Sequence, residues 1–312
     1  MSGRPRAVSR PYAGEADLLQ MREMLMEARA RTGSDWSHAH VGLLAWDFLM
    51  VLCHLDPQRH IRLWHGEGGR LVGYAMVGDD PQFFCQVLPQ HGWSGIESEG
   101  LAWAEALVAD LRRDDPAQWS GALMSGARQD DAVRIAFLEE HGFHYRGEFA
   151  EVDMIRSLDG ALPEVVLPEG FLVRALAGAE EVGERAAAYR EVWQPWTVGD
   201  VSDGDYRALM GLPGYDRELD LVAVGPDGTL AAYVNCWLDR VNRIGDLGPV
   251  GARPAYRRRG LTRAVLLEGM RRLRDRGMDR ACVSTGVANP AAQALYESVG
   301  FRVVNRYLDY VK

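Results

Sequence analysis

A basic turn closed by glycine joins a predicted strand to a predicted helix near residue 260. The strand covers Asp246–Val250, the turn reads Arg257-Arg258-Arg259-Gly260, and apolar residues then recur at helical spacing from Leu261 onward. A helix start offers free N–H groups and the positive end of the macrodipole, worth about 1 kcal/mol to an anion. Glycine also lets a ligand approach the backbone closely. The pattern indicates a phosphate-holding turn, although a basic run is also typical of a solvated helix start.

This turn resembles the coenzyme A signature of the GNAT superfamily of N-acetyltransferases. In that signature Gln or Arg is followed by two residues, Gly, one residue, and Gly or Ala. Here the pattern runs Arg257-x-x-Gly260-x-Thr262, and Thr262 departs from the last position. The family's other motif, Asn-x-x-Ala-x-x-Leu-Tyr-x-x-x-Gly-Phe, is matched from Asn289 to Phe301. Two motifs in the right order make the resemblance strong over the second half of the chain.

The chain is long enough for two copies of such a fold. At 312 residues it exceeds one compact core of ordinary size. The stretch Ala136–Phe143 mirrors Ala294–Phe301, and prolines and glycines interrupt both periods at residues 160–170. We therefore expect an α/β fold of two tandem GNAT-like domains, 1–160 and 161–312. Each would have a central, mostly antiparallel twisted sheet flanked by helices.

The first domain is predicted to have lost its cofactor site. Aligned through the duplication, Gly100 stands against Gly260, and Glu97 and Glu99 stand where the second copy has arginines. Each carboxylate beside a diphosphate would cost about 1–4 kcal/mol. The same alignment pairs Leu138 with Tyr296 and Asp131 with Asn289. A misalignment of a few residues is the alternative interpretation.

Periodicity predicts the elements of the second domain in the order β-α-(α)-β-β-β-α-β-α-β. The predicted strands are 171–174, 220–224, 230–239, 243–252 and 280–285, with a last strand from 301 to 312 that has a counterpart at 143–158. The predicted helices are 179–192, 261–276 and 291–299. Because residues 230–237 are apolar on both faces, this strand is expected inside the sheet.

Acetyl transfer from a thioester to an amine needs a neutral amine, a donor for the developing oxyanion and a proton for the departing thiolate. The N–H groups of Val250, Gly251 and Ala252 can hold the thioester carbonyl if the strand opens at Gly248-Pro249. Opening is plausible because proline cannot complete a ladder, and the resemblance implies it as well. The alternative is that the proline ends an edge strand.

Tyr296 and Asp246 are the candidate catalytic residues. A phenol with a pKa of about 10 can protonate a thiolate, and the resemblance assigns Tyr296 this role of general acid. Judged by spacing alone, a tyrosine at this position is more often part of a helix core or rim. All eight histidines lie between His38 and His144, so we expect no histidine base in the second domain. Asp246 matches the position of a glutamate base in many relatives and would act through a water, while a turn aspartate is the alternative.

The resemblance implies acetyl-CoA as the co-substrate and no metal. The expected cofactor-binding residues are Val250, Gly251, Ala252, Arg257, Arg258, Arg259, Gly260, Leu261, Thr262, Asn289 and Tyr296. Asn289 is also expected to cap the helix that follows it. His38 and His40 are spaced for metal binding, but no third ligand is placed by spacing. The four cysteines, Cys53, Cys85, Cys236 and Cys282, are expected to be buried thiols.

Composition restricts the class of protein. The net charge of −9 argues against a nucleic-acid partner, and hydrophobic residues make up 47% without a run long enough to span a membrane. The sequence begins without an apolar leader segment, which favours a cytoplasmic location. The sequence is compatible with a homodimer.

The expected function is transfer of an acetyl group to the amine of a small molecule. Acids between residues 200 and 220, preceded by Trp193 and Trp196, would attract a cationic acceptor, although acid-rich connectors are also common. Among tandem GNAT proteins the chain is most similar to the mycothiol synthase-like group. The alternatives are an aminoglycoside or polyamine acetyltransferase and, outside the enzymes, an acyl-CoA-binding sensor. The acids between residues 200 and 220 that would attract a cationic acceptor are Asp200, Asp203, Asp205, Asp216, Glu218 and Asp220.

Overall fold

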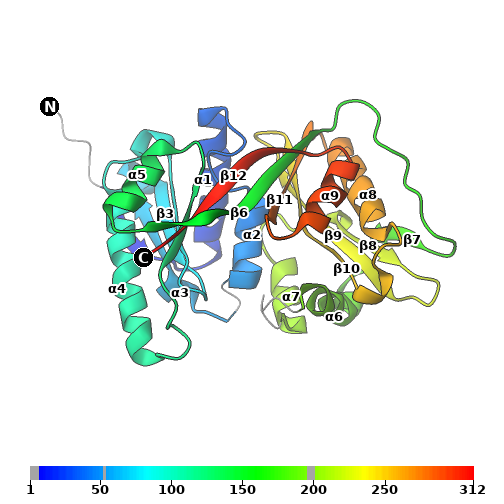
Figure 1. Cartoon of the computed structure of the whole chain (residues 1–312), viewed down its shortest axis with the longest axis horizontal. Helices are drawn as coiled ribbons and strands as arrows, with labels where there is room; N and C mark the ends of the chain where they lie inside the picture. The colour runs from blue at the N-terminus through cyan, green and yellow to red at the C-terminus, as the bar shows by residue number, and fades with distance from the viewer. Residues whose placement is uncertain (1–6, 52–53, 195–200) are drawn as a thin grey trace. The chain divides into compact units, whose positions relative to one another are not determined.

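The computed structural model describes residues 7–51, 54–194 and 201–312. The chain forms two compact units, coloured along the sequence in Figure 1. Unit 1 comprises Met1–Ala39, His54–Val152 and Asn305–Lys312, and unit 2 comprises His40–Cys53 and Asp153–Val304. Each unit therefore contains chain from both halves of the sequence. The division into a degenerate domain 1–160 and an active domain 161–312 stays a prediction.

Unit 1 is built on an antiparallel sheet with the strand order β1-β2-β3-β4. Helices α1 and α4 pack against β3. The strands are β1 Val8–Pro11, β2 Ile61–His65, β3 Leu71–Val77, β4 Phe83–Val87 and β5 Met124–Arg128. The helices are α1 Glu15–Thr32, α3 Pro57–His60, α4 Ile96–Asp114 and α5 Ala132–Glu140.

Unit 2 is built on strands in the order β7-β8-β9-β10-β11, antiparallel except for the parallel pair β10 and β11. These strands are β7 Leu172–Ala175, β8 Asp220–Val224, β9 Leu230–Asp239, β10 Ile244–Ala252 and β11 Arg280–Gly286. Two long strands, β6 His144–Ser157 and β12 Arg302–Val311, have residues in both units. The helices are α2 Val41–Trp46, α6 Val182–Trp193, α7 Asp203–Met210, α8 Leu261–Asp275 and α9 Pro290–Ser298.

Glycines let α8 lie directly on the sheet of unit 2. A Cβ at Gly269 of α8 would lie 2.9 Å from a Leu247 methyl and 3.0 Å from Cys236 Sγ. Successive residues of a strand point to opposite faces. Tyr233 and Asn235 of β9 accordingly face α6 on the other side. As predicted, β9 is an interior strand, buried along nearly its whole length.

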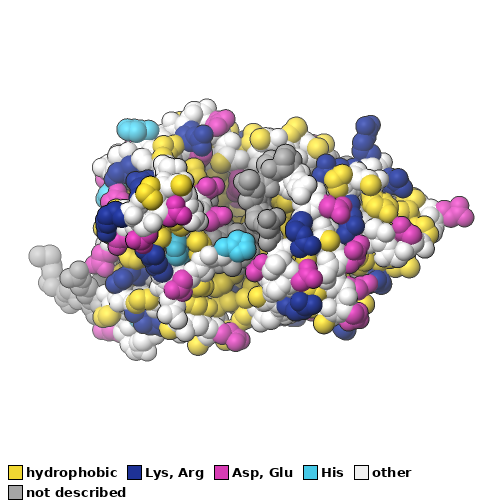
Figure 2. Space-filling model, turned by 90° about the horizontal axis from the view of Figure 1, so that it is seen from below, with side chains coloured by type: hydrophobic (Ala, Val, Ile, Leu, Met, Phe, Trp, Pro, Cys, Tyr) yellow, Lys and Arg dark blue, Asp and Glu magenta, His cyan; other side chains and the backbone are white. Residues whose placement is uncertain are grey.

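The predicted elements of residues 161–312 are confirmed with boundary shifts of a few residues, and the mixed α/β fold is confirmed. Cys85, Cys236 and Cys282 are buried free thiols, while Cys53 lies outside the described residues. Within the described residues, no helix is long and apolar enough to cross a membrane. On the face drawn in Figure 2, acidic and basic side chains are interspersed.

Candidate active site

The turn between β10 and α8 leaves the start of α8 open. The chain passes through a 3₁₀ turn, Pro254–Tyr256, before α8 begins. Gly260 precedes the helix with a φ of 80°, and a Cβ built on it would meet no atom within 4 Å. No side chain in the described part of the chain caps this end of α8. The first N–H groups of the helix are therefore left for an external acceptor such as a phosphate.

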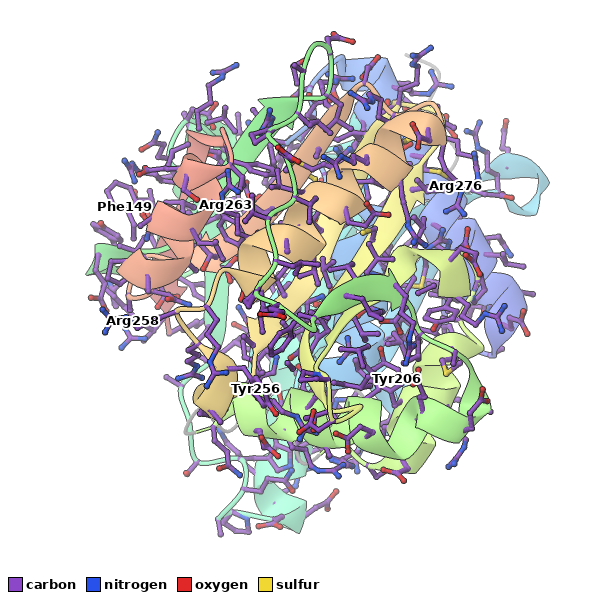
Figure 3. The ribbon with its side chains drawn as sticks, turned by 90° about the vertical axis from the view of Figure 1, so that its right-hand side faces the viewer. Phe149, Tyr206, Tyr256, Arg258, Arg263 and Arg276 are labelled. Carbon is purple, nitrogen blue, oxygen red and sulfur yellow. The ribbon has the colours of Figure 1, made fainter. Side chains whose placement is uncertain are left out.

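The arginines around this turn supply positive charge. Arg257 turns back, and its Nη2 donates to the carbonyl of Val192 at the end of α6, at 3.3 Å. Arg258 and Arg259 are exposed, and Arg263 is half-buried on the first turn of α8. Figure 3 labels Arg258 and Arg263. Among residues 7–51, 54–194 and 201–312, none of these arginines forms an ion pair with a carboxylate. Their charge is thus not neutralised by the described protein groups and favours an anionic ligand.

β10 and β11 part beyond Asp246. Their parallel pairing ends where Asp246 lies opposite Cys282. On its other edge, β10 shifts register against β9 after Leu247, and Trp237 Nε1 donates to the Gly248 carbonyl at 2.9 Å. The predicted opening of the strand is confirmed. Since alternate residues of a strand direct their N–H groups to opposite edges, some donors beyond this point face the opening. Their contact with a thioester carbonyl stays a prediction.

Tyr296 lies on α9 and is buried, with 6% of its surface exposed. Its ring meets that of Phe301 edge-on, with 6.0 Å between the ring centres. Burial raises the pKa of the Tyr296 phenol, and the negative charge of Asp246 raises it further. The phenol therefore stays protonated at neutral pH.

Asp246 is half-buried on β10, and its Oδ1 accepts a hydrogen bond from the Cys282 thiol at 3.6 Å. Asn289 caps α9, because its Oδ1 accepts the N–H of Ala292 at 3.2 Å, so the predicted cap is confirmed. A contact between Asn289 and the cofactor stays a prediction. Asp246, the opening of the sheet and the turn before α8 all belong to unit 2.

Comparison with known proteins decides which family this arrangement belongs to. A sequence model of the acetyltransferase (GNAT) family matches residues 185–301, which contain the turn, α8 and α9. The mycothiol acetyltransferase of Kineococcus radiotolerans is 35% identical over 256 residues, covering 75% of this chain and 76% of its own length. The chain belongs to the GNAT acetyltransferase family. It is an N-acetyltransferase.

Other relatives extend the likeness over nearly the whole acetyltransferase. The mycothiol acetyltransferase of Nocardia farcinica is 29% identical over 301 residues, covering 90% of this chain and 89% of its own. A GCN5-related N-acetyltransferase from Sphaerobacter thermophilus has the same fold, with a TM-score of 0.64 at 21% identity, over 99% of this chain and 96% of that one. A tandem GNAT protein from the clavulanic acid biosynthesis pathway gives 0.63 at 16% identity, over 98% of each chain.

One acid that the sequence assigned to acceptor attraction lies instead in the interior of the acetyltransferase. Asp220 and Arg185 are fully buried, and Arg185 Nε donates to Asp220 Oδ1 at 3.3 Å. Tyr206 and Tyr215 donate to the other oxygen of Asp220 at 2.6 and 3.0 Å, and Arg185 Nη2 donates to Asn235 at 2.6 Å. Sequence reasoning missed Arg185, although a lone arginine on the apolar face of a helix is the signal for a buried partner.

Other acids of that segment are engaged in helix caps and ion pairs. Asp205 forms a reciprocal capping box with Ser202 at the start of α7. Ion pairs join Asp203 to Arg190 at 3.8 Å, Asp216 to Arg276 at 3.0 Å, and Glu218 to Arg272 at 3.7 Å and to Arg217 at 3.5 Å. Trp196 and Asp200 lie outside the described residues. The acids are thus partly neutralised, which weakens the expected attraction of a cationic acceptor.

One histidine from outside residues 161–312 lies in unit 2. His40 belongs to unit 2, with 6% of its surface exposed. Its Nε2 lies 3.3 Å from the Ile244 carbonyl of β10, two residues before Asp246. His38, by contrast, lies in unit 1 and contacts the Val87 carbonyl at 2.8 Å. In the described part of the chain, no group of three or more His, Cys, Asp or Glu side chains is placed to hold a metal.

α4 is the counterpart of α8 in unit 1. It begins after Gly95 in the left-handed conformation, as α8 begins after Gly260. The alignment of Gly100 with Gly260 is therefore wrong, because Gly100 lies inside α4. The acidic character of this helix start is nevertheless real, since Glu97 and Glu99 both lie in its first turn. Glu97 Oε1 accepts a hydrogen bond from the backbone N–H of Trp93 at 2.7 Å.

Proposed function

We propose that this acetyltransferase transfers the acetyl group of acetyl-CoA to the primary amine of a small molecule, directly in a ternary complex. The observation that carries the proposal is the start of α8 behind Gly260, which within the described residues is uncapped and lies beside arginines without carboxylate partners. Backbone donors, a glycine that leaves space beside them and unneutralised positive charge fit a diphosphate. The proposed cofactor contacts run from Arg257 to Thr262 on the turn and the first residues of α8.

The chemistry can be assigned to two residues at the opening of the sheet. Acetyl-CoA supplies an activated acyl group whose C–S bond breaks as the C–N bond forms. Asp246 would accept the proton that the amine loses, through a bridging water. Tyr296 would donate its proton to the sulfur that leaves, because its phenol is protonated at neutral pH. Proton exchange with solvent then restores both groups.

For the acceptor, the relatives favour the amine precursor of mycothiol over an aminoglycoside or a polyamine. Proteins named mycothiol acetyltransferase match 75% of this chain at 35% identity and 90% of it at 29% identity. A polycationic acceptor would need free acids, whereas several acids between residues 203 and 220 are occupied by arginines and helix N–H groups.

We further propose that unit 1 does not bind acetyl-CoA. The acids at the start of α4 would repel a diphosphate. In addition, Trp36–Ala39 bridges the ends of β4 and β5. His38 contacts the Val87 carbonyl of β4 at 2.8 Å, and Arg128 of β5 donates to the Trp36 carbonyl at 2.8 Å. This segment lies at the strand ends that correspond to the opening between β10 and β11.

Calorimetric titration of the full chain with acetyl-CoA tests the proposal. We expect one site per chain, followed by turnover in a panel that contains the mycothiol precursor, an aminoglycoside and a polyamine. Two sites would contradict the proposal for unit 1. Absence of binding would overturn the whole proposal. Turnover of only the polyamine or the aminoglycoside would overturn the acceptor assignment and leave the reaction type intact.

A further inference from the structure

A short helix from the first half of the chain lies against the strand that carries the candidate base. α2 belongs to unit 2 and packs against β9 and β10. His40 fixes its start, because Nδ1 accepts the N–H of Gly42 at 2.9 Å. The proton of this imidazole is therefore on Nε2, which donates to the Ile244 carbonyl at 3.3 Å. Through these two hydrogen bonds, the imidazole links the start of α2 to β10.

Gly42 touches the carboxylate of Asp246. A Cβ built on Gly42 would lie 2.5 Å from Asp246 Oδ2 and 2.9 Å from Cδ1 of Trp237, too close for any side chain. The other carboxylate oxygen, Oδ1, accepts the hydrogen bond from the Cys282 thiol. The two oxygens of Asp246 are therefore in contact with different elements, β11 on one side and α2 on the other.

We propose that Gly42 and His40 are positioning residues for acetyl transfer, and that the first half of the chain thereby completes the site of the second. Gly42 leaves the space that the Asp246 carboxylate occupies, and His40 holds α2 at the distance that keeps this space open. The inference rests on the proposed role of Asp246 as general base. A base must stay within hydrogen-bond reach of the proton that it accepts, and a shift of about 1 Å can cost about 10²-fold in rate.

The test is Gly42→Ala in the full chain, assayed with the best amine of the panel. The added methyl must displace the carboxylate, so we expect kcat to fall at least about 10-fold. The acid limb of the pH profile should shift, while the KM for acetyl-CoA changes little, because α8 is untouched. Gly204→Ala is the matched control, since its Cβ would meet only Ser202 Oγ, at 3.4 Å. Wild-type kcat and pH profile in Gly42→Ala would overturn the inference.

A second variant separates positioning from folding. His40→Asn keeps a cap acceptor for Gly42 but is too short to reach Ile244, so α2 loses its tie to β10. We expect a lower kcat and a shifted pH profile, with a melting temperature close to that of the native protein. If Gly42→Ala does not fold, wild-type kinetics in His40→Asn would overturn the inference.

Two further measurements distinguish this inference from the proposed function. Asp246→Asn in the same assay tests the base: full turnover would overturn the base role and the inference with it. If the Asp246→Asn variant is inactive while the Gly42→Ala variant is fully active, only the inference about Gly42 and His40 is overturned. A crystal structure of the Gly42→Ala variant tests the position of the carboxylate without any amine substrate. We expect a displaced Asp246 carboxylate, and an unmoved carboxylate would contradict the proposal.

Discussion

The Asp246 carboxylate and the Cys282 thiol meet at 3.6 Å, at the last pair of residues that joins β10 to β11. Beyond this pair the two strands separate, so Asp246 lies at the apex of the opening. The thiol donates to Oδ1, which fixes the orientation of the carboxylate. The strand that leads to the turn before α8 therefore carries the candidate base where β10 and β11 separate.

Tyr296→Phe should lower kcat about 10²-fold, because the variant lacks the proton that the leaving sulfur needs. The affinity for acetyl-CoA should change little, since the phenol lies on α9 and not on the candidate phosphate-binding turn. Steady-state kinetics and calorimetry measure the two quantities. Tyr310→Phe is the control, because that buried phenol donates to Glu139 in unit 1. Unchanged turnover in Tyr296→Phe would remove this residue from the mechanism.

Gly260→Asp should abolish acetyl-CoA binding, because it places a negative charge at the start of α8. Gly277→Asp at the far end of the same helix is the matched control. Gly277 has a φ of 87°, and a Cβ there also meets no atom within 4 Å, so the backbone strain is comparable. Calorimetry should show binding in the control alone. Retained affinity in Gly260→Asp would mean that the diphosphate binds elsewhere.

Arg185→Met should lower the free energy of unfolding by about 3–5 kcal/mol, because it leaves the fully buried charge of Asp220 without its cation. Arg190→Met is the control, since Arg190 and Asp203 form a partly exposed pair at 3.8 Å, worth about 1 kcal/mol or less. Denaturant unfolding of both variants measures the difference. Equal losses would contradict the assignment of Arg185 and Asp220 as an interior ion pair.

Stability should fall above pH 10, the ordinary pKa of tyrosine. Burial raises the pKa of Tyr12 to about 12 and raises the pKa values of Tyr206, Tyr215, Tyr233 and Tyr296. In this range the unfolded chain loses protons that the folded chain keeps, so the free energy of unfolding decreases as the pH rises. Denaturant unfolding at several pH values on both sides of 10 measures the effect. A flat profile through pH 11 would contradict it.

Patterns within short stretches of sequence were enough to predict the helices and strands of the second copy and the glycine-closed turn before α8. α8 and β9 were predictable because their apolar periods lie within short stretches, and Gly260 because a left-handed turn before a helix is a property of adjacent residues. The cap by Asn289 is local as well. The alignment of the two copies failed at Gly100 because an amphipathic helix has no sharp sequence boundary without a capping side chain, and neither α4 nor α8 has one.

The sequence by itself determined the strand, turn and helix that form the candidate phosphate site, since each depends on the conformational preferences of neighbouring residues. Only the tertiary structure decided which distant residues surround Asp246 and which ones neutralise Asp220. Gly42 and Asp246, and Arg185 and Asp220, are far apart in sequence and meet through packing. Such contacts follow from the burial of whole faces of helices and strands, and many pairings satisfy the same apolar pattern. The fold selects one of them because only close packing without cavities or unpaired buried charges is stable.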